Sequence, residues 1–127
     1  MKFIHIADVH LGAAPDKNTP WAQERKNHSR KAFEQVINIA EEEQVDLLLI
    51  AGDLFHRQPL QRELKEVNYQ FSKLSHTQVV LIAGNHDFIN PESYYRTFPW
   101  EKNVHFLKKE SVEYVELPML RTRGYGL

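Results

Sequence analysis

The chain has 127 residues, a net charge of −1 and 42% hydrophobic residues, which suits one globular unit with a core and argues against disorder. It contains no cysteine, so disulfides, thiolate zinc sites and cysteine nucleophiles are excluded. The near-neutral charge creates no global basic field, so a bound nucleic acid would have to be held by a local site. The first residues are too polar for a signal peptide, and no segment approaches the roughly 18 apolar residues of a membrane span. We therefore expect a cytoplasmic protein without a membrane partner.

The hydrophobic pattern predicts three strands that alternate with two helices. Short continuous apolar runs predict buried strands, whereas apolar residues at i, i+3, i+4 and i+7 predict helices. In chain order the expected elements are a strand at 3–7, a loop at 8–20 that holds Gly12, Pro15 and Pro20, a helix at 21–43, a strand at 46–51, a helix at 60–74 and a strand at 79–83. Such an alternation indicates parallel βαβ units with both sheet faces covered.

The pattern changes after residue 100. Residues 104–107 and 112–117 are short and partly alternating, with no helix between them, so we expect added strands, for which a hairpin is one arrangement. Residues 121–127 show neither a polar tail nor a helix cap, so we expect the sequence to stop within an element. The prediction is therefore a single portion of an α/β domain over residues 1–127, with a βαβαβ parallel core, added short strands and a truncated end.

Polar residues follow each of the three predicted core strands. In open α/β sheets, ligands bind at the carboxyl ends of the parallel strands, so the three clusters fall on one edge. Carboxylate, imidazole and amide groups all coordinate divalent metals. Each cluster alone would fit an ordinary turn or cap, and the joint placement carries the prediction. The clusters are Asp8-Val9-His10, Gly52-Asp53-Leu54-Phe55-His56 and Gly84-Asn85-His86-Asp87.

This donor set suits phosphate chemistry. Asp53 offers two oxygens and can bridge two cations about 3.5–4 Å apart. Two divalent ions held by only the Asp8 and Asp53 carboxylates leave a net charge of about +2, which attracts a phosphate anion. Metal ions of this kind activate water for attack on phosphorus, and His86 and His56 would stabilise the developing charge or protonate the leaving oxygen.

These three clusters resemble the first three signature blocks of the calcineurin-like metallophosphoesterases. Residues 3–12 and 51–56 are further similar to the SbcD-type DNA double-strand-break-repair nucleases, including the YhaO-like bacterial branch. The resemblance spans residues 3–87 and implies a metallophosphoesterase α/β sandwich with exonuclease or endonuclease activity on DNA. It also implies two Mn²⁺ ions, an SbcC-type ABC ATPase partner and a homodimer.

The resemblance also implies roles for individual residues. Asp53 would bridge the two ions, and His86 would donate a proton at the scissile phosphate with His56 beside it. Asp87 is expected to orient its neighbours. The implied metal ligands are Asp8, His10, Asp53 and Asn85, and the implied catalytic groups are His86 and His56.

The sequence also departs from the family pattern. The family completes its site with three further histidines, and His105 is the single histidine after His86, without the family's block around it. We therefore expect an incomplete site and no activity from these 127 residues alone. His5 alternates with Ile4 and Ile6, so it is expected to be buried, either behind the metal ligands or in the core.

Other functions stay open at this point. One alternative is a phosphodiesterase or phosphatase for nucleotides or small phosphate esters, and another is a non-catalytic truncated module that binds a partner. The basic run at 25–31 is expected to be a solvated helix face, with DNA contact as the alternative. The aromatic residues at 94–100 are expected to cover the core, with base stacking as the alternative.

Overall fold

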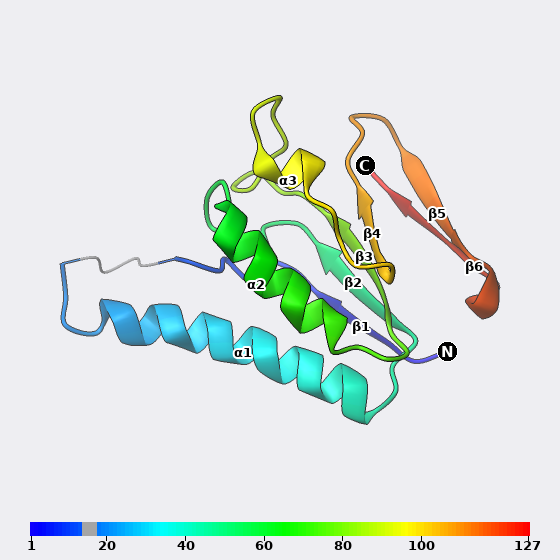
Figure 1. Cartoon of the computed structure of the whole chain (residues 1–127), viewed down its shortest axis with the longest axis horizontal. Coiled ribbons are helices and arrows are strands. Elements are labelled where there is room, and N and C mark those ends of the chain that lie inside the picture. The colour runs from blue at the N-terminus through cyan, green and yellow to red at the C-terminus, as the bar shows by residue number, and fades with distance from the viewer. Residues whose placement is uncertain (14–17) are drawn as a thin grey trace.

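The computed structural model describes residues 1–13 and 18–127, so Pro15 of the expected loop lies outside the described residues. Strands and helices alternate through the first two thirds of the chain, as Figure 1 shows. The elements are β1 (Phe3–Ile6), α1 (Ala22–Glu42), β2 (Leu47–Ala51), α2 (Gln61–Ser72), β3 (Gln78–Ile82), α3 (Tyr94–Thr97), β4 (Val104–Leu107), β5 (Glu113–Leu117), a 3₁₀ turn (Pro118–Leu120) and β6 (Thr122–Gly126). The expected α/β fold with a parallel core is confirmed.

Four parallel strands form the main sheet in the order β1-β2-β3-β4. The register pairs Leu48 of β2 with Val79 of β3 and with Ile4 of β1. Because all four strands run the same way, their carboxyl ends lie at one edge of the sheet.

Both long helices cover one face of the sheet (Figure 1). Alternate strand residues point to this face, and they pack against the apolar stripes of the two helices. Tyr95 of α3 closes this core beside the helices and is fully buried. The buried residues of this face include Phe33 and Ile37 of α1, Leu48 and Ile50 of β2, Leu64 and Phe71 of α2, and Val79 and Leu81 of β3.

The opposite face is covered by the β5–β6 hairpin and the 3₁₀ turn rather than by helices. Leu47, Val80 and Leu107 from three strands meet Leu117 of β5 there. This second cluster lies over β2, β3 and β4, while Phe3 of β1 is 58% exposed. The prediction that β1 is a buried strand is therefore wrong, because β1 is an edge strand with one face open in the described structure.

The C-terminal strands differ from the expected hairpin. β4 joins the main sheet in parallel with β3, and β5 pairs antiparallel with β6. Arg121 has a left-handed backbone conformation (φ 50°) and closes the turn before β6. The sequence did not predict this turn. Gly126 serves packing, since a Cβ at this position would lie 2.5 Å from Leu107 Cδ1.

Two further expectations can be compared with the structure. Of the aromatic run, Tyr95 is buried while Phe98 and Trp100 pack against the core, so the expected core cover is confirmed for these three. Within the described ranges, no helix is both long enough and apolar enough to cross a membrane.

Candidate metal centre

The three polar clusters meet at the carboxyl edge of the sheet. The pairing of β1 with β2 continues past both strands through backbone hydrogen bonds, which keep the first two loops in register. These bonds run from Asp8 N to Gly52 O (3.2 Å), His10 N to Asp53 O (3.0 Å), Leu11 N to Leu54 O (2.8 Å) and His56 N to Leu11 O (3.0 Å). The sheet therefore sets the spacing between the Asp8–His10 segment and the Asp53–His56 segment.

The ligand-bearing residues adopt an unusual backbone conformation. Asp8 (φ 54°), His10 (φ 52°) and Asp53 (φ 50°) are three of the five non-glycine residues with positive φ in the described ranges. A left-handed conformation costs about 1–3 kcal/mol for such residues and concentrates at functional sites. Gly52 (φ 88°) takes the same region without this cost. The strain thus falls on the residues whose side chains form the cluster.

Asp53 lies at the centre of the site and is 5% exposed. Its Oδ1 accepts a hydrogen bond from the backbone N–H of His86 at 2.9 Å. A Cβ added to Gly84 would lie 2.1 Å from the same Oδ1 atom, which is inside van der Waals contact. The third loop can therefore approach the Asp53 carboxylate because residue 84 has no side chain.

Asp87 ties the second loop to the third. Its carboxylate is fully buried, and it accepts hydrogen bonds from Phe55 N (3.0 Å) and Gly84 N (2.7 Å). Burial raises the pKa of the Asp87 carboxyl, and the two N–H donors oppose that shift while the charge of Asp53 adds to it. This side chain holds backbone in place and does not face solvent.

Asp8, His10 and Asp53 form one set of donors. His10 Nε2 lies 3.9 Å from Asp8 Oδ1 and 3.9 Å from Asp53 Oδ2. Two donors on one small divalent ion lie at most about 4.2 Å apart, which is twice a typical bond of about 2.1 Å. Both pairs fit that limit, and the Asp8 side chain, 72% exposed, has room to turn. One imidazole and two carboxylates suit a divalent cation.

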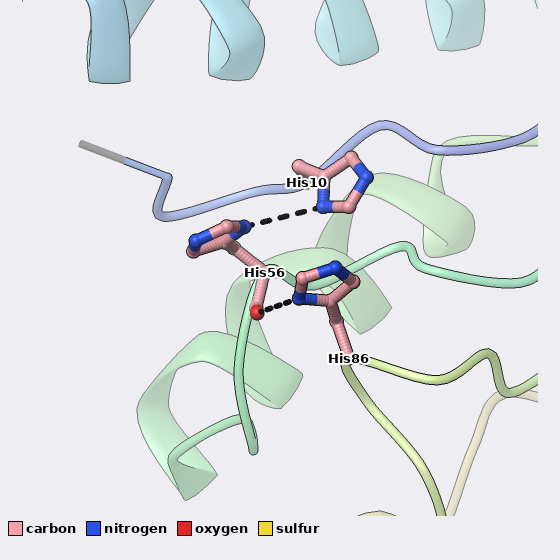
Figure 2. A group of neighbouring side chains, drawn as sticks. All are labelled: His10, His56 and His86. Carbon is pink, nitrogen blue, oxygen red and sulfur yellow. Dashed lines mark hydrogen bonds between the residues drawn. The ribbon is translucent and has the colours of Figure 1, made fainter. Parts of the chain in front are cut away.

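Three imidazoles form a second group beside the first. His10, His56 and His86 come from three separate loops and point toward one another, as Figure 2 shows. His56 Nδ1 lies 3.2 Å from His10 Nδ1, and His86 Nδ1 lies 3.1 Å from the His56 carbonyl oxygen. The His56 and His86 rings stack with centroids 5.0 Å apart. His56 and His86 are exposed, so they can reach a ligand at the surface of the site.

The other residues singled out from the sequence, Asn85, His5 and His105, lie outside these two groups of side chains. Asn85 is exposed in the third loop, directly before His86. His5 is exposed on the sheet face away from the helices, so the expectation that it is buried is wrong, because β1 is an edge strand. His105 lies in β4, where it contacts Gln78 Oε1 at 2.8 Å and burial lowers its pKa.

The sequence reasoning missed the contact among the three imidazoles. Spacing predicts that His10, His56 and His86 share one edge of the sheet, but it does not predict the direction of each ring. One sequence signal for this contact is that each polar cluster contains a histidine. His10 lies two residues after Asp8, His56 three residues after Asp53, and His86 directly after Asn85.

The amino-acid sequence matches a known protein family. The family model described as calcineurin-like phosphoesterase matches residues 1–122, and the chain belongs to this family. The expected resemblance to calcineurin-like metallophosphoesterases is therefore confirmed.

Similar proteins include DNA repair proteins. The DNA double-strand break repair protein Mre11 of Archaeoglobus fulgidus is 44% identical over 91 residues, which are 68% of this chain and 19% of that protein. The uncharacterized metallophosphoesterase YhaO of Bacillus subtilis is 32% identical over 114 residues, 83% of this chain and 27% of YhaO. The SbcD component of the nuclease SbcCD of Bacillus subtilis is 27% identical over 126 residues, 93% of this chain and 30% of that component. The chain thus spans less than a third of the length of these relatives.

Proposed function

We propose that residues 1–127 are one portion of a metallophosphoesterase domain that hydrolyses phosphodiester bonds in DNA. The observation that carries the proposal is the donor set of Asp8, His10 and Asp53, which is built on three left-handed backbone positions. The names of the Mre11 and SbcCD relatives point to DNA as the substrate. We also infer a cytoplasmic protein.

The proposed centre uses two divalent ions, Mn²⁺ by analogy with the family. Asp8, His10 and Asp53 would hold the first ion, and Asp53 would bridge to a second that also takes Asn85. When bound, such ions neutralise phosphate charge and activate the attacking water. The cation-binding chemistry of one imidazole and two carboxylates supports this assignment.

The histidines of the second and third loops would act on the leaving group. His86 is anchored by its backbone hydrogen bond to Asp53, so its ring stays beside the metal ligands. We propose that His86 protonates the leaving oxygen as general acid. His56, stacked on His86, would hold that ring and stabilise charge on the phosphate.

The proposal extends to partners. One relative is named as one component of a nuclease called SbcCD, so it works in a complex. We propose that the whole protein acts on DNA with an SbcC-type ABC ATPase and as a homodimer.

The test is a cleavage assay with the natural full-length polypeptide and Mn²⁺ on linear DNA. Asp53→Asn removes one ligand charge, and Asp46→Asn makes the same chemical change at the opposite end of the sheet. We expect Asp53→Asn to lose at least about 100-fold in rate while Asp46→Asn retains the wild-type rate. Equal rates for the wild type and Asp53→Asn would show that this cluster is not the active site.

A further inference from the structure

The segment that carries His86 is anchored to the second loop on both sides of this histidine. At the histidine itself, the His86 N–H donates to Asp53 Oδ1 at 2.9 Å. Two residues later, the Phe88 carbonyl accepts a hydrogen bond from Gln58 Nε2 at 2.5 Å. Gln58 lies two residues after His56, so this bond joins the two chain segments whose histidine rings stack on each other. Gln58 is thus a contact of the site that the metal-binding donor set does not include.

Both ends of the Gln58 carboxamide are hydrogen-bonded. Its nitrogen donates to the Phe88 carbonyl, and its Oε1 accepts a hydrogen bond from Ser93 Oγ at 3.0 Å. Ser93 is buried and directly precedes α3, where its carbonyl accepts a hydrogen bond from Arg96 N at 3.2 Å. A polar network whose members are all satisfied makes a structure more rigid. The Phe88 carbonyl is therefore tied both to the second loop and to the start of α3.

Asp87 holds a different part of the same two loops. Its carboxylate accepts hydrogen bonds from Phe55 N and Gly84 N, which both precede the histidine of their own loop. Gln58 and the Phe88 carbonyl both follow that histidine. The chain is therefore fixed ahead of the two histidines by Asp87 and behind them by Gln58.

The direction of the His86 ring depends on this spacing. His86 is exposed, so burial does not hold its side chain, and its Nδ1 lies 3.1 Å from the His56 carbonyl oxygen (Figure 2). A carbonyl oxygen only accepts, so Nδ1 carries the proton in this hydrogen bond. Nε2 is then the nitrogen that remains to face a leaving oxygen. A change in the distance between the two loops would break this bond and let the ring turn.

We propose that Gln58 is a positioning residue, whose bond to the Phe88 carbonyl keeps the His86 ring directed by the His56 carbonyl, with Nε2 toward the leaving oxygen. The inference rests on the proposed function, in which His86 protonates that oxygen. As water attacks phosphorus, the P–O bond of the leaving group breaks and its electron pair stays on the leaving oxygen, which takes the proton from Nε2. Gln58 acts through His86 and has no contact of its own with the substrate.

The test compares two substrates of the full-length protein with Mn²⁺. Cleavage of DNA expels an alkoxide, which needs a proton, whereas bis(p-nitrophenyl) phosphate expels p-nitrophenolate, which is stable without one. Gln58→Met removes the carboxamide with little change in side-chain volume. Gln35→Met makes the same change at an exposed position of α1 and is the matched control. His86→Gln shows what loss of the proton donor does to each substrate.

We expect Gln58→Met to lower kcat on DNA at least about 10-fold more than kcat on the small diester. KM for DNA should change less than about 2-fold, because the substitution affects the reacting step rather than binding. His86→Gln should show the same selectivity with a larger loss, about 100-fold or more. Ser93→Ala, which releases the Oε1 end of the carboxamide alone, should show it with a smaller loss. Gln35→Met should retain the wild-type rates, and a general loss of structure would lower both activities alike.

A second measurement does not depend on cleavage. The nitrogen chemical shifts of a histidine ring report which of its two nitrogens carries the proton. At alkaline pH and without metal, we expect the wild-type His86 ring to be protonated on Nδ1, because the His56 carbonyl accepts from that atom. Gln58→Met should give a mixture of the two tautomers. His86→Gln identifies the His86 signals, because they are lost in that variant.

Two results would overturn the inference. One is an equal loss of kcat on the two substrates in Gln58→Met, and the other is an unchanged proton position on the His86 ring in that variant. A DNA-selective loss in His86→Gln without one in Gln58→Met would also overturn it and leave the proposed function standing. A wild-type protein that cleaves neither substrate, but whose His86 tautomer changes in Gln58→Met, would contradict the proposed function and support the positioning of the ring by Gln58.

Discussion

The two ends of the parallel sheet are built in opposite ways. At the carboxyl end, Asp8, His10 and Asp53 hold left-handed backbone conformations. The nearby His56 and His86 are exposed. At the amino end, polar groups in the segments that precede the strands are paired with one another. Thr77 Oγ1 donates to Val45 O at 2.6 Å, and Asp46 contacts His76 Nε2 at 2.7 Å and the Lys2 N–H at 2.8 Å.

This difference indicates that the amino end of the sheet contributes mainly to stability and the carboxyl end to ligand binding. Satisfied hydrogen bonds at the amino end, such as the one from Thr77 to Val45, stabilise the fold. Strained backbone at the carboxyl end costs stability, and it persists because the sheet and the hydrogen bonds of Asp87 hold the loops. Substitutions at the two ends should therefore separate into those that change ligand binding and those that change stability alone.

The largest loss of stability is expected from Asp87→Ala. It would leave the buried N–H groups of Phe55 and Gly84 without their acceptor, at a cost of about 1–3 kcal/mol for each. Urea unfolding measures this loss. Asp87→Asn is the control, since its amide oxygen retains one acceptor and should recover part of the lost stability.

Gly84→Ala should follow in size. The new methyl group would lie 2.1 Å from Asp53 Oδ1, and the backbone or the carboxylate would have to move. We expect a loss of about 1–3 kcal/mol together with weaker Mn²⁺ binding. Gly124→Ala is the comparison, because a Cβ there meets Val115 at an ordinary 3.5 Å. Undiminished Mn²⁺ affinity in Gly84→Ala would contradict the tight approach of the two loops.

Asp8→Gly should change stability in the opposite direction. Asp8 has φ 54° and an exposed side chain, so glycine relieves backbone strain and loses few contacts. We expect a gain of about 1 kcal/mol in unfolding free energy and loss of Mn²⁺ binding. Thermal unfolding without metal, paired with a metal titration, measures both. A variant that is less stable than the wild type would indicate that this end of the sheet is not strained.

Thr77→Val tests the amino end. The substitution removes the buried hydrogen bond to the Val45 carbonyl and should cost about 1 kcal/mol. Mn²⁺ binding should be unchanged, because Thr77 precedes β3 at the end of the sheet away from the ligands. A clear change in Mn²⁺ affinity would show that the two ends are coupled.

The smallest effect concerns pH. The hydrogen bond from His76, followed by the Lys2 N–H, lowers the pKa of Asp46 below its usual 3.8. The stabilisation is therefore present above pH 3.8 and is lost as the pH falls through the lower folded-state value. Acid unfolding of Asp46→Asn should show a flatter dependence of stability on pH below about 4 than that of the wild type. The same dependence of stability on pH below about 4 in the wild type and Asp46→Asn would show that the Asp46 carboxylate does not stabilise the fold.

The sequence predicted the core and the edge that carries the site, for reasons of pattern. Continuous apolar runs such as 47–50 identify strands in the middle of a sheet, and polar residues after them must fall at one edge. The sequence-based prediction that His5 is buried was wrong, because the apolar pattern of a strand does not show whether other strands pair with both of its edges. The sequence did not predict β6, since Gly124 and Gly126 have low strand propensity and the close approach of Gly126 to Leu107 of β4 is a tertiary contact.

The sequence predicted that the three polar clusters share one edge of the sheet, but it did not predict the backbone geometry that joins them. The left-handed backbone of Asp8, His10 and Asp53 follows from hydrogen bonds between loops that are distant in sequence. The same holds for the approach of Gly84 to Asp53, which no local pattern encodes.

The most direct test of the metal centre is a calorimetric Mn²⁺ titration of the full-length protein, with Asp53→Asn and Asp46→Asn as matched variants. The structure predicts that the wild type and Asp46→Asn bind Mn²⁺ alike, and that Asp53→Asn binds about 100-fold more weakly or not at all. Equal affinity of Asp53→Asn and the wild type, or no Mn²⁺ binding by the wild type, would contradict the assignment of the carboxyl edge as a metal centre.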